Sequence, residues 1–251
     1  YTLMTGGQTD LWVYDTRTTR AAPVVEDHED SAWPAWSPDC DRMVFVRSTR
    51  TSHIFAGEPG AADQRQLTHG PALDFAPLAS PDGKWIAFLS KRPAAKGEPG
   101  TPLLCVMPAA GGEVKELDLK GVSLPASSDP VMTWSADSRQ LAFNASDGAS
   151  KMDIYRIGRD GEGFARVTVE PGEEVEPHWS PDGRFISYTQ AGAGRLEIAI
   201  VPAHGGLPRV INPEGLKCES GVWSPGSERL AYVAYQNSGR FEIWVTPVAA
   251  P

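Results

Sequence analysis

Residues 179–188 read Trp-Ser-Pro-Asp-Gly-Arg-Phe-Ile-Ser-Tyr, and four other segments of the chain repeat this pattern in the same phase. In each segment an anchor residue is followed by Ser, then by Pro or Ala, then by Asp or Gly. An aromatic residue stands nine positions after each anchor. The anchors are Trp36, Ala79, Trp134, Trp179 and Trp223, and the aromatics are Phe45, Phe88, Phe143, Tyr188 and Tyr232. The chain therefore contains an internal repeat.

The period and the side-chain pattern of this repeat indicate strands. Successive anchors are 43, 55, 45 and 44 residues apart, a period typical of a propeller blade of four antiparallel strands. In the segment quoted above, Ile186 and Tyr188 stand seven and nine positions after the anchor, so they share one face of a strand. The sequence predicts an all-β propeller of four-stranded antiparallel blades.

A tight turn is expected between each anchor and the strand that follows it. Ser-Pro-Asp-Gly occupies residues 80–83 and 180–183, and Asp-Gly tolerates the positive backbone angles that such a turn needs. The large anchor Trp is then expected to fill the space between neighbouring sheets. We therefore interpret the repeated Ser and Asp as structural residues and not as catalytic candidates.

A further strand is expected after each hairpin, followed in most repeats by a Gly-bearing turn and a short outer strand. These third strands are predicted at residues 11–15, 54–56, 103–107, 153–157, 196–201 and 241–246. The phase of the repeat divides a single propeller domain, residues 1–251, into six blades. The blades are a partial one at 1–29, complete ones at 30–70, 71–120, 121–170 and 171–213, and one at 214–251 that lacks its outer strand.

The two incomplete blades suggest that the chain is part of a longer one. The first residue is Tyr1 and not Met, which agrees with this expectation. Exposed sheet edges are a hazard, and propellers commonly close by sharing strands from both termini. Further domains of a longer protein are therefore expected.

The repeats resemble those of TolB-type β-propellers. The resemblance rests on the Trp-Ser-Pro-Asp-Gly turn, the strand Ile86-Ala87-Phe88 and the strand Asp153-Ile154-Tyr155, and it covers nearly the whole chain. It implies six blades and a periplasmic or otherwise extracytoplasmic location. Similar repeats occur in TolB itself, in the propeller domains of prolyl oligopeptidase-like peptidases, in oligogalacturonate lyases and in bacterial sensor domains, so the resemblance points to a fold more than to one role.

Composition narrows the classes of partner. The chain carries 23 Lys and Arg against 32 Asp and Glu, a net charge of -9. Nucleic-acid binding depends largely on cationic contacts to phosphates, so a nucleic-acid partner is not expected. A basic protein or peptide partner, a bound cation or plain solubility fits the negative charge better. No apolar run approaches the roughly 18–20 residues of a membrane span. The three cysteines lack metal-site spacing.

Acidic residues recur where the chain enters each innermost strand. They stand five or six positions before the anchors, or four before the last one: Asp30, Asp74, Asp129, Glu173, Glu174 and Glu219. If they converge at one mouth of the central channel, they could hold a divalent cation such as calcium or attract a basic segment of a partner. The alternative is that Asp and Glu simply favour turns and solvated loops.

His178 is a further candidate for ligand binding. It directly precedes Trp179 and could point into the channel. Strand histidines are more often packed or hydrogen-bonded than functional.

Catalytic and cofactor motifs are not found. Residues 222–226 imitate part of a nucleophile elbow, but they belong to a repeat turn. No glycine-rich phosphate loop opens a helix. The sequence predicts neither a catalytic residue nor an organic cofactor.

Three functions agree with these patterns. The favoured one is a non-enzymatic binding or sensing propeller that recognises a protein or ligand through its channel mouth and loops. The second is the gating propeller of a prolyl oligopeptidase-like serine peptidase. The third is a lyase of the oligogalacturonate type, which is ranked last because an acidic mouth repels a uronate.

Overall fold

A computed structural model describes residues 1–5, 7–25, 29–61, 63–93, 100–125, 132–148, 151–236 and 240–248. In these ranges every regular element is a β-strand, as the repeat predicted. The described residues include no helix long and apolar enough to cross a membrane. The chain divides into two compact units, one with Tyr1–Leu117 and one with Asp118–Pro125 and Pro130–Pro251.

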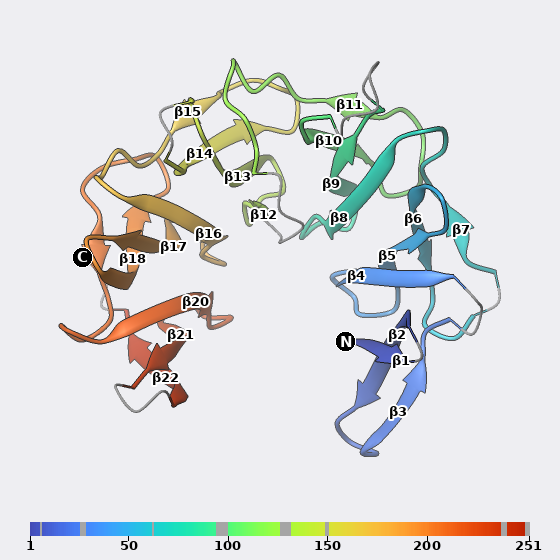
Figure 1. Ribbon diagram of the computed structural model, residues 1–251, viewed down its shortest axis with the longest axis horizontal. Coiled ribbons are helices and arrows are strands. Elements are labelled where there is room, and N and C mark those ends of the chain that lie inside the picture. The colour runs from blue at the N-terminus through green and yellow to red at the C-terminus, as the bar shows by residue number, and fades with distance from the viewer. Residues whose placement is uncertain are drawn as a thin grey trace. The chain divides into compact units, whose positions relative to one another are not determined.

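The first unit contains eleven strands, shown in blue to green in Figure 1. Strand order is antiparallel and sequential, and one parallel pairing of Ser52 with Leu73 joins β6 to β8. The strands are β1 (Thr2–Thr5), β2 (Gln8–Asp15), β3 (Arg20–Pro23), β4 (Asp30–Trp36), β5 (Met43–Ser48), β6 (Ser52–Gly57), β7 (Arg65–Gln66), β8 (Leu73–Ala79), β9 (Trp85–Lys91), β10 (Leu103–Pro108) and β11 (Lys115–Glu116).

The second unit contains three sheets of antiparallel, sequential strands. The first is β12 (Met132–Trp134), β13 (Gln140–Ala145), β14 (Asp153–Gly158) and β15 (Ala165–Arg166), and the second is β16 (Glu173–Trp179), β17 (Phe185–Gly192), β18 (Arg195–Pro202) and β19 (Arg209–Val210). The third is β20 (Lys217–Trp223), β21 (Arg229–Tyr235) and β22 (Phe241–Pro247).

These strands follow the predicted order within each repeat. Each predicted third strand lies within an observed one, for example residues 196–201 within β18. The outer strands are short. β15 and its equivalents β7, β11 and β19 hold only two residues each. Over the described residues the antiparallel groups hold three strands in the first and last groups and four in each of the others. The division into six blades stays a prediction.

The hydrophobic core contains the positions that the repeat placed on one face of a strand. Positions seven and nine after each anchor are at most 2% exposed in all five repeats. The residues at position nine, such as Tyr188 and Phe143, are among the largest fully buried side chains. A fully buried large apolar side chain contributes about 1.5–3 kcal/mol, so this alternation accounts for much of the stability of each sheet.

The Ser and Asp of the repeat hold the turn between the first two strands. Ser180 Oγ donates a hydrogen bond to Asp182 at 2.7 Å and accepts one from the Phe185 amide at 2.9 Å. Ser80 and Ser135 make the same pair of bonds in their repeats. The next position has a positive φ, 76° at Gly183 and 61° at Cys40. The Ser and Asp side chains of the repeat are therefore hydrogen-bonded within the turn, as predicted.

The expectation that every anchor Trp fills an interior space is wrong for Trp36. Trp179 and Trp223 are each 9% exposed, whereas Trp36 is 44% exposed. Trp223 donates its indole N–H to the carbonyl oxygen of a residue 45 positions earlier. The anchors therefore differ in burial from one repeat to the next.

A β-bulge interrupts the innermost strands β4, β8, β16 and β20. It lies three residues before the anchor, at residues with positive φ: Trp33 (49°), Ala76 (49°), Glu176 (55°) and Ser220 (57°). A bulge adds one residue to one strand and so shifts the alternation of its side chains. The residue five positions before the anchor therefore lies on the same face as the anchor.

Candidate functional site

The predicted site residues are distributed over both units. Asp30 and Asp74 belong to the first unit, and Glu173, Glu174, His178 and Glu219 belong to the second. Asp129 lies outside the described residues. The carboxylate ring around a common channel stays a prediction, and the two groups are described separately.

In the first unit the two acids differ in environment. Asp30 is exposed at the start of β4 and accepts a hydrogen bond of 2.7 Å from the Thr9 amide of β2. Asp74 is only 3% exposed and accepts a 2.6 Å bond from Ser90 Oγ on the paired strand β9. The ring of His53, from β6, lies 3.9 Å from the other Asp74 oxygen. Asp74 therefore faces the interior between two repeats.

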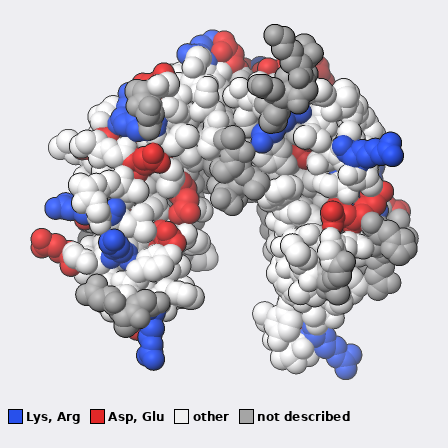
Figure 2. Space-filling view, in the orientation of Figure 1, with Lys and Arg blue, Asp and Glu red and all other residues white. Residues whose placement is uncertain are grey.

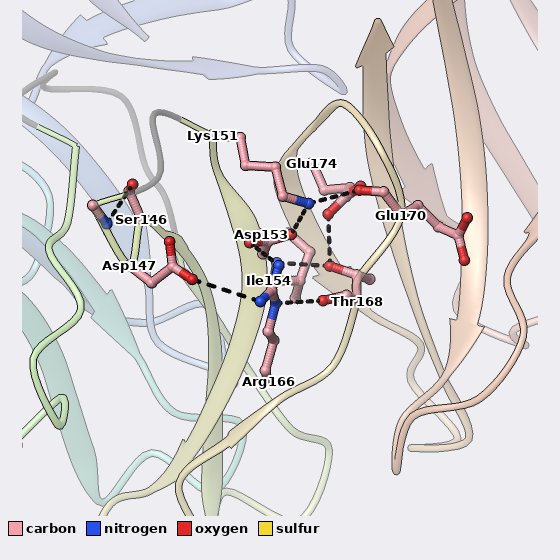
Figure 3. A network of polar contacts seen from close by, with 10 residues as sticks. Ser146, Asp147, Lys151, Asp153, Ile154, Arg166, Thr168, Glu170 and Glu174 are labelled. Carbon is pink, nitrogen blue, oxygen red and sulfur yellow. Dashed lines mark hydrogen bonds and ion pairs between the residues drawn. The ribbon is translucent and has the colours of Figure 1, made fainter.

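Glu174 occupies the equivalent position in the second unit and is fully buried (Figure 3). Its Oε2 accepts a 2.9 Å hydrogen bond from the hydroxyl of Thr168, which itself accepts one of 2.9 Å from the Ile154 amide. Its Oε1 is buried without a hydrogen-bond partner among the described residues. The carboxyl group is thus only half satisfied.

Asp153 is a second fully buried carboxylate in this network. Lys151 Nζ lies 2.9 Å from one of its oxygens and Arg166 Nη2 lies 2.6 Å from the other. Both cations also bind main-chain oxygens, since Lys151 donates to Glu170 at 2.7 Å and Arg166 donates to Thr168 at 3.0 Å. Figure 3 shows these side chains converging between β14 and the start of β16.

The two buried carboxyls have opposite protonation tendencies. Burial, together with the neighbouring Asp153, raises the pKa of Glu174 to about 7 against the opposing hydrogen bond from Thr168. Burial also opposes ionisation of Asp153, but hydrogen bonds from Lys151 and Arg166 outweigh it and lower the pKa of Asp153. The network therefore keeps Asp153 ionised and favours a proton on Glu174.

Glu176, at the bulge of β16, joins two innermost strands. Its Oε2 accepts hydrogen bonds from Thr189 Oγ1 at 2.9 Å and from the Ser220 amide of β20 at 3.1 Å. Sequence reasoning overlooked this residue, although it is followed by Pro177. A proline inside a strand marks an edge or a bulge, so this signal was present.

His178 lies beside this bulge and is engaged by the main chain. Its Nδ1 is 3.0 Å from the carbonyl oxygen of Glu176, and its own carbonyl accepts the 3.0 Å bond from Trp223. Burial lowers the pKa of His178. A largely neutral, packed imidazole therefore stands at this position.

Three acids lie on the adjacent strands β16 and β20, and we call them the acidic strip: Glu173, Glu176 and Glu219. Glu173 is exposed, and Glu219 is partly exposed and accepts a hydrogen bond from the Tyr235 hydroxyl. That bond, burial and the charges of Glu219 and Glu176 raise the pKa of Tyr235. Figure 2 shows acidic side chains gathered on the viewed face where β16 and β20 lie. The strip is an anionic surface.

The described residues offer no preformed metal centre. Within them, no group of three or more His, Cys, Asp or Glu side chains is placed to hold a metal ion. All three cysteines are free, with Cys40 exposed and Cys105 and Cys218 buried. Burial raises the pKa of Cys105 to about 12 and that of Cys218 to about 11, so both buried thiols are protonated at neutral pH.

Curated relatives match parts of the chain, while no protein-family model matches it. An uncharacterized peptidase, YuxL of Bacillus subtilis, is 28% identical over 200 residues, covering 62% of this chain and 29% of that protein. A TolB homolog of Chlorobium chlorochromatii is 28% identical over 151 residues, covering 60% of this chain and 31% of that protein. The chain thus spans less than a third of the length of these relatives.

Solved structures show the same fold. TolB from Acinetobacter baumannii aligns with a TM-score of 0.67 and 22% identity, covering 96% of this chain and 60% of that one. An oligogalacturonate lyase from Vibrio parahaemolyticus aligns with a TM-score of 0.74 and 12% identity, covering 96% and 72%. Repeated antiparallel sheets with a common anchor and these neighbours define a β-propeller. The chain therefore has a TolB-like β-propeller fold and is similar in sequence to TolB homologues.

Proposed function

We propose that this propeller is a non-enzymatic recognition module that binds a basic segment of a protein partner through the acidic strip. The observation that carries the proposal is that the acids at the starts of the innermost strands differ in exposure to solvent. Glu173 is exposed and Glu219 partly exposed, whereas Asp74 and Glu174 are buried and bonded to neighbouring side chains. Among the described acids at the strand entries of the second unit, only the first pair can meet a partner, and Asp30 is the exposed one in the first unit.

Electrostatics supports this choice of partner. Carboxylates on adjacent strands reinforce one another's field and attract Lys and Arg side chains. The net charge of -9 adds a longer-range attraction for basic partners. A divalent cation such as calcium would compete for the same carboxylates, and no organic cofactor is needed for this role.

The repeated serines support a role without catalysis. Ser180 and Ser135 are bonded to the aspartates of their own turns, and Ser224, in the segment that imitates a nucleophile elbow, accepts a bond from the Arg229 amide. These hydroxyls stabilise turns instead of facing a general base. Similarity to TolB proteins supports an extracytoplasmic location, where a soluble recognition propeller could meet a protein partner.

Calorimetric titration with a ten-residue Lys-rich peptide, at low and high salt, tests the proposal. We expect the double variant Glu173→Gln/Glu219→Gln to bind at least tenfold more weakly. The control Glu113→Gln/Glu162→Gln removes the same charge from exposed positions in other turns and should bind like the original protein. Equal affinities of the two double variants, or absence of binding heat, would contradict the proposal. A parallel calcium titration shows whether the strip also holds a cation.

A second candidate function is the gating propeller of a serine peptidase. It is favoured by the 28% identity to the peptidase YuxL, of which this chain covers 29%. The test is the encoding gene: a Gly-x-Ser-x-Gly elbow beyond the codon for Pro251, with fluorophosphonate labelling of the full gene product, would favour this alternative. The recognition proposal predicts neither.

A further inference from the structure

Ala79 departs from the other four anchors, which are all Trp. It lines a pocket of about 800 Å³ in the first unit. The pocket lies where the sheet β4–β7 meets β8–β11, and these strands are neighbours in Figure 1. Its apolar lining comes from Met43 and Val44 on β5, Ala56 on β6, and Ile86 on β9.

The second unit shows what normally fills this space. There Trp223 packs with Ile200 in one buried cluster. The ring of Phe185 stacks on Trp223 with centroids 6.5 Å apart and an interplanar angle of 20°. A large apolar residue thus stands at each of three positions between β16–β19 and β20–β22.

The equivalent residues of the first unit are smaller or polar. Ala79 replaces Trp223, and Arg42 replaces Phe185, since each stands six positions after its anchor. Ala56 replaces Ile200 because each stands two residues after an isoleucine, Ile54 or Ile198, with an equivalent hydrogen bond. The amide of that isoleucine binds the side chain two residues beyond the outer strand, Thr68 or Asn212. All three replacements line the pocket. The pocket therefore lies at the positions that Trp223, Phe185 and Ile200 fill in the second unit.

The lining selects a ligand with two chemical features. Met43 and Ile86 are at most 2% exposed, so the floor is apolar. Charged lining residues are mainly acidic: Asp39, Asp41, Glu58 and Asp63 against Arg42 and Arg65. Arg65 donates a 2.6 Å hydrogen bond to the Ala110 carbonyl, and a hydrogen bond from Ser37 lowers the pKa of Asp39. The pocket therefore combines an apolar floor with a surplus of negative charge.

We propose that this pocket binds a small organic cation that carries an aromatic ring. The ring occupies the place of the missing indole, and the ammonium group lies toward the carboxylates, where its charge is stabilised. The volume falls within the roughly 300–1,000 Å³ of small-molecule sites. This site lies in the first unit and does not depend on the acidic strip.

Titration calorimetry with tryptamine, indole and indole-3-acetate tests the proposal. We expect tryptamine to bind at least tenfold more tightly than indole-3-acetate, with indole between them. Ala79→Trp restores the anchor and should weaken tryptamine binding at least tenfold. Unchanged tryptamine affinity in this variant, or no binding at millimolar concentration to the original protein, would overturn the proposal.

A second variant that fills the pocket provides a control in case Ala79→Trp fails to fold. Ala56→Leu places a larger side chain on the opposite wall and should also weaken tryptamine binding at least tenfold, while the circular dichroism spectrum stays that of the original protein. Glu58→Gln/Asp63→Asn should reduce the preference for tryptamine over indole-3-acetate at least threefold. The control Glu113→Gln/Glu162→Gln should leave that preference unchanged. An equal loss of preference in both charge variants would show that net charge, and not the pocket, selects the ligand.

Discussion

The indole Nε1 of Trp223 donates a hydrogen bond of 3.0 Å to the backbone carbonyl oxygen of His178 and so joins β20 to β16. Trp223→Phe keeps an aromatic ring but removes this donor and leaves the carbonyl with the longer 3.3 Å bond from Ser187 Oγ. We expect the free energy of unfolding to fall by about 1–3 kcal/mol. Urea denaturation followed by circular dichroism measures this change.

The exposed anchor is the control for this substitution. Trp36 is 44% exposed, so Trp36→Phe should change the free energy of unfolding by less than about 0.5 kcal/mol. Equal losses for the two variants would show that the interstrand bond contributes nothing.

Glu174 gives stability a definite pH dependence. Its pKa is raised from 4.5 to about 7 in the folded state, so its contribution is fully present below the unfolded pKa and is lost as the pH rises through about 7. Glu174→Gln imitates the protonated form and removes this loss. Relative to the original protein, we expect the variant to gain roughly 2–3 kcal/mol between pH 4.5 and pH 8. Denaturant titrations at both pH values measure the gain.

The buried ion network should be costly to break. Asp153→Asn leaves Lys151 and Arg166 without their shared buried carboxylate. We expect a loss of roughly 3–5 kcal/mol in the free energy of unfolding at pH 7.

An exposed ion pair provides the comparison. Lys120 Nζ lies 2.7 Å from Asp118 Oδ2 at the surface, and Asp118→Asn should lower the free energy of unfolding far less than Asp153→Asn does, because solvent screens the exposed pair. A similar cost for both variants, measured by urea denaturation, would contradict a special role for burial.

The turns offer a paired test of backbone strain. Cys40 and Gly183 occupy the same place in their repeats, with φ values of 61° and 76°. Cys40→Gly should stabilise the protein by about 0.5–1 kcal/mol, and Gly183→Ala should destabilise it by about 1 kcal/mol, because a Cβ atom disfavours this conformation. No atom lies within 4 Å of a Cβ built at Gly183, so packing does not obscure the effect. Calorimetric melting temperatures that move in the opposite directions would refute it.

Much of the fold could be predicted from local spacing. The interval from Trp179 to Tyr188 fixed a turn and a strand, because turn chemistry and alternating burial act over a few residues. The predicted third strand at residues 153–157 lies within β14 for the same reason. Predictions that depended on neighbours distant in sequence fared less well, as the exposure of Trp36 shows.

The burial of Glu174 could not be predicted by alternation alone. Glu174 and Trp179 are five residues apart, so a regular strand would place them on opposite faces. The bulge at Glu176 places them on one face. Pro34, Pro77 and Pro177 follow three of the bulge residues and could have indicated them, since proline is confined to edges and bulges in sheets.

The residues that surround Glu174 also could not be predicted from its neighbours in sequence. Asp153 is 21 residues before Glu174 and lies on another sheet, so only the folded chain brings Lys151 and Arg166 into the same network. The pocket at Ala79 could be predicted in part. The missing Trp and the replacement at Arg42 are visible in the sequence, but the replacement at Ala56 requires the strand register.

The bulge also limits how the repeat can change in length. Adding or removing two residues within an innermost strand would preserve which side chains enter the interior, whereas a change of one would exchange them. A deletion of Phe75 that kept the bulge at Ala76 would carry the carboxylate of Asp74 outward and turn the alkyl side chain of Leu73 inward. The alternation of side chains thus keeps the interval between acid and anchor at five residues in Asp74–Ala79 and Glu174–Trp179. The connections outside the innermost strands are not limited in this way, and one interval between anchors reaches 55 residues.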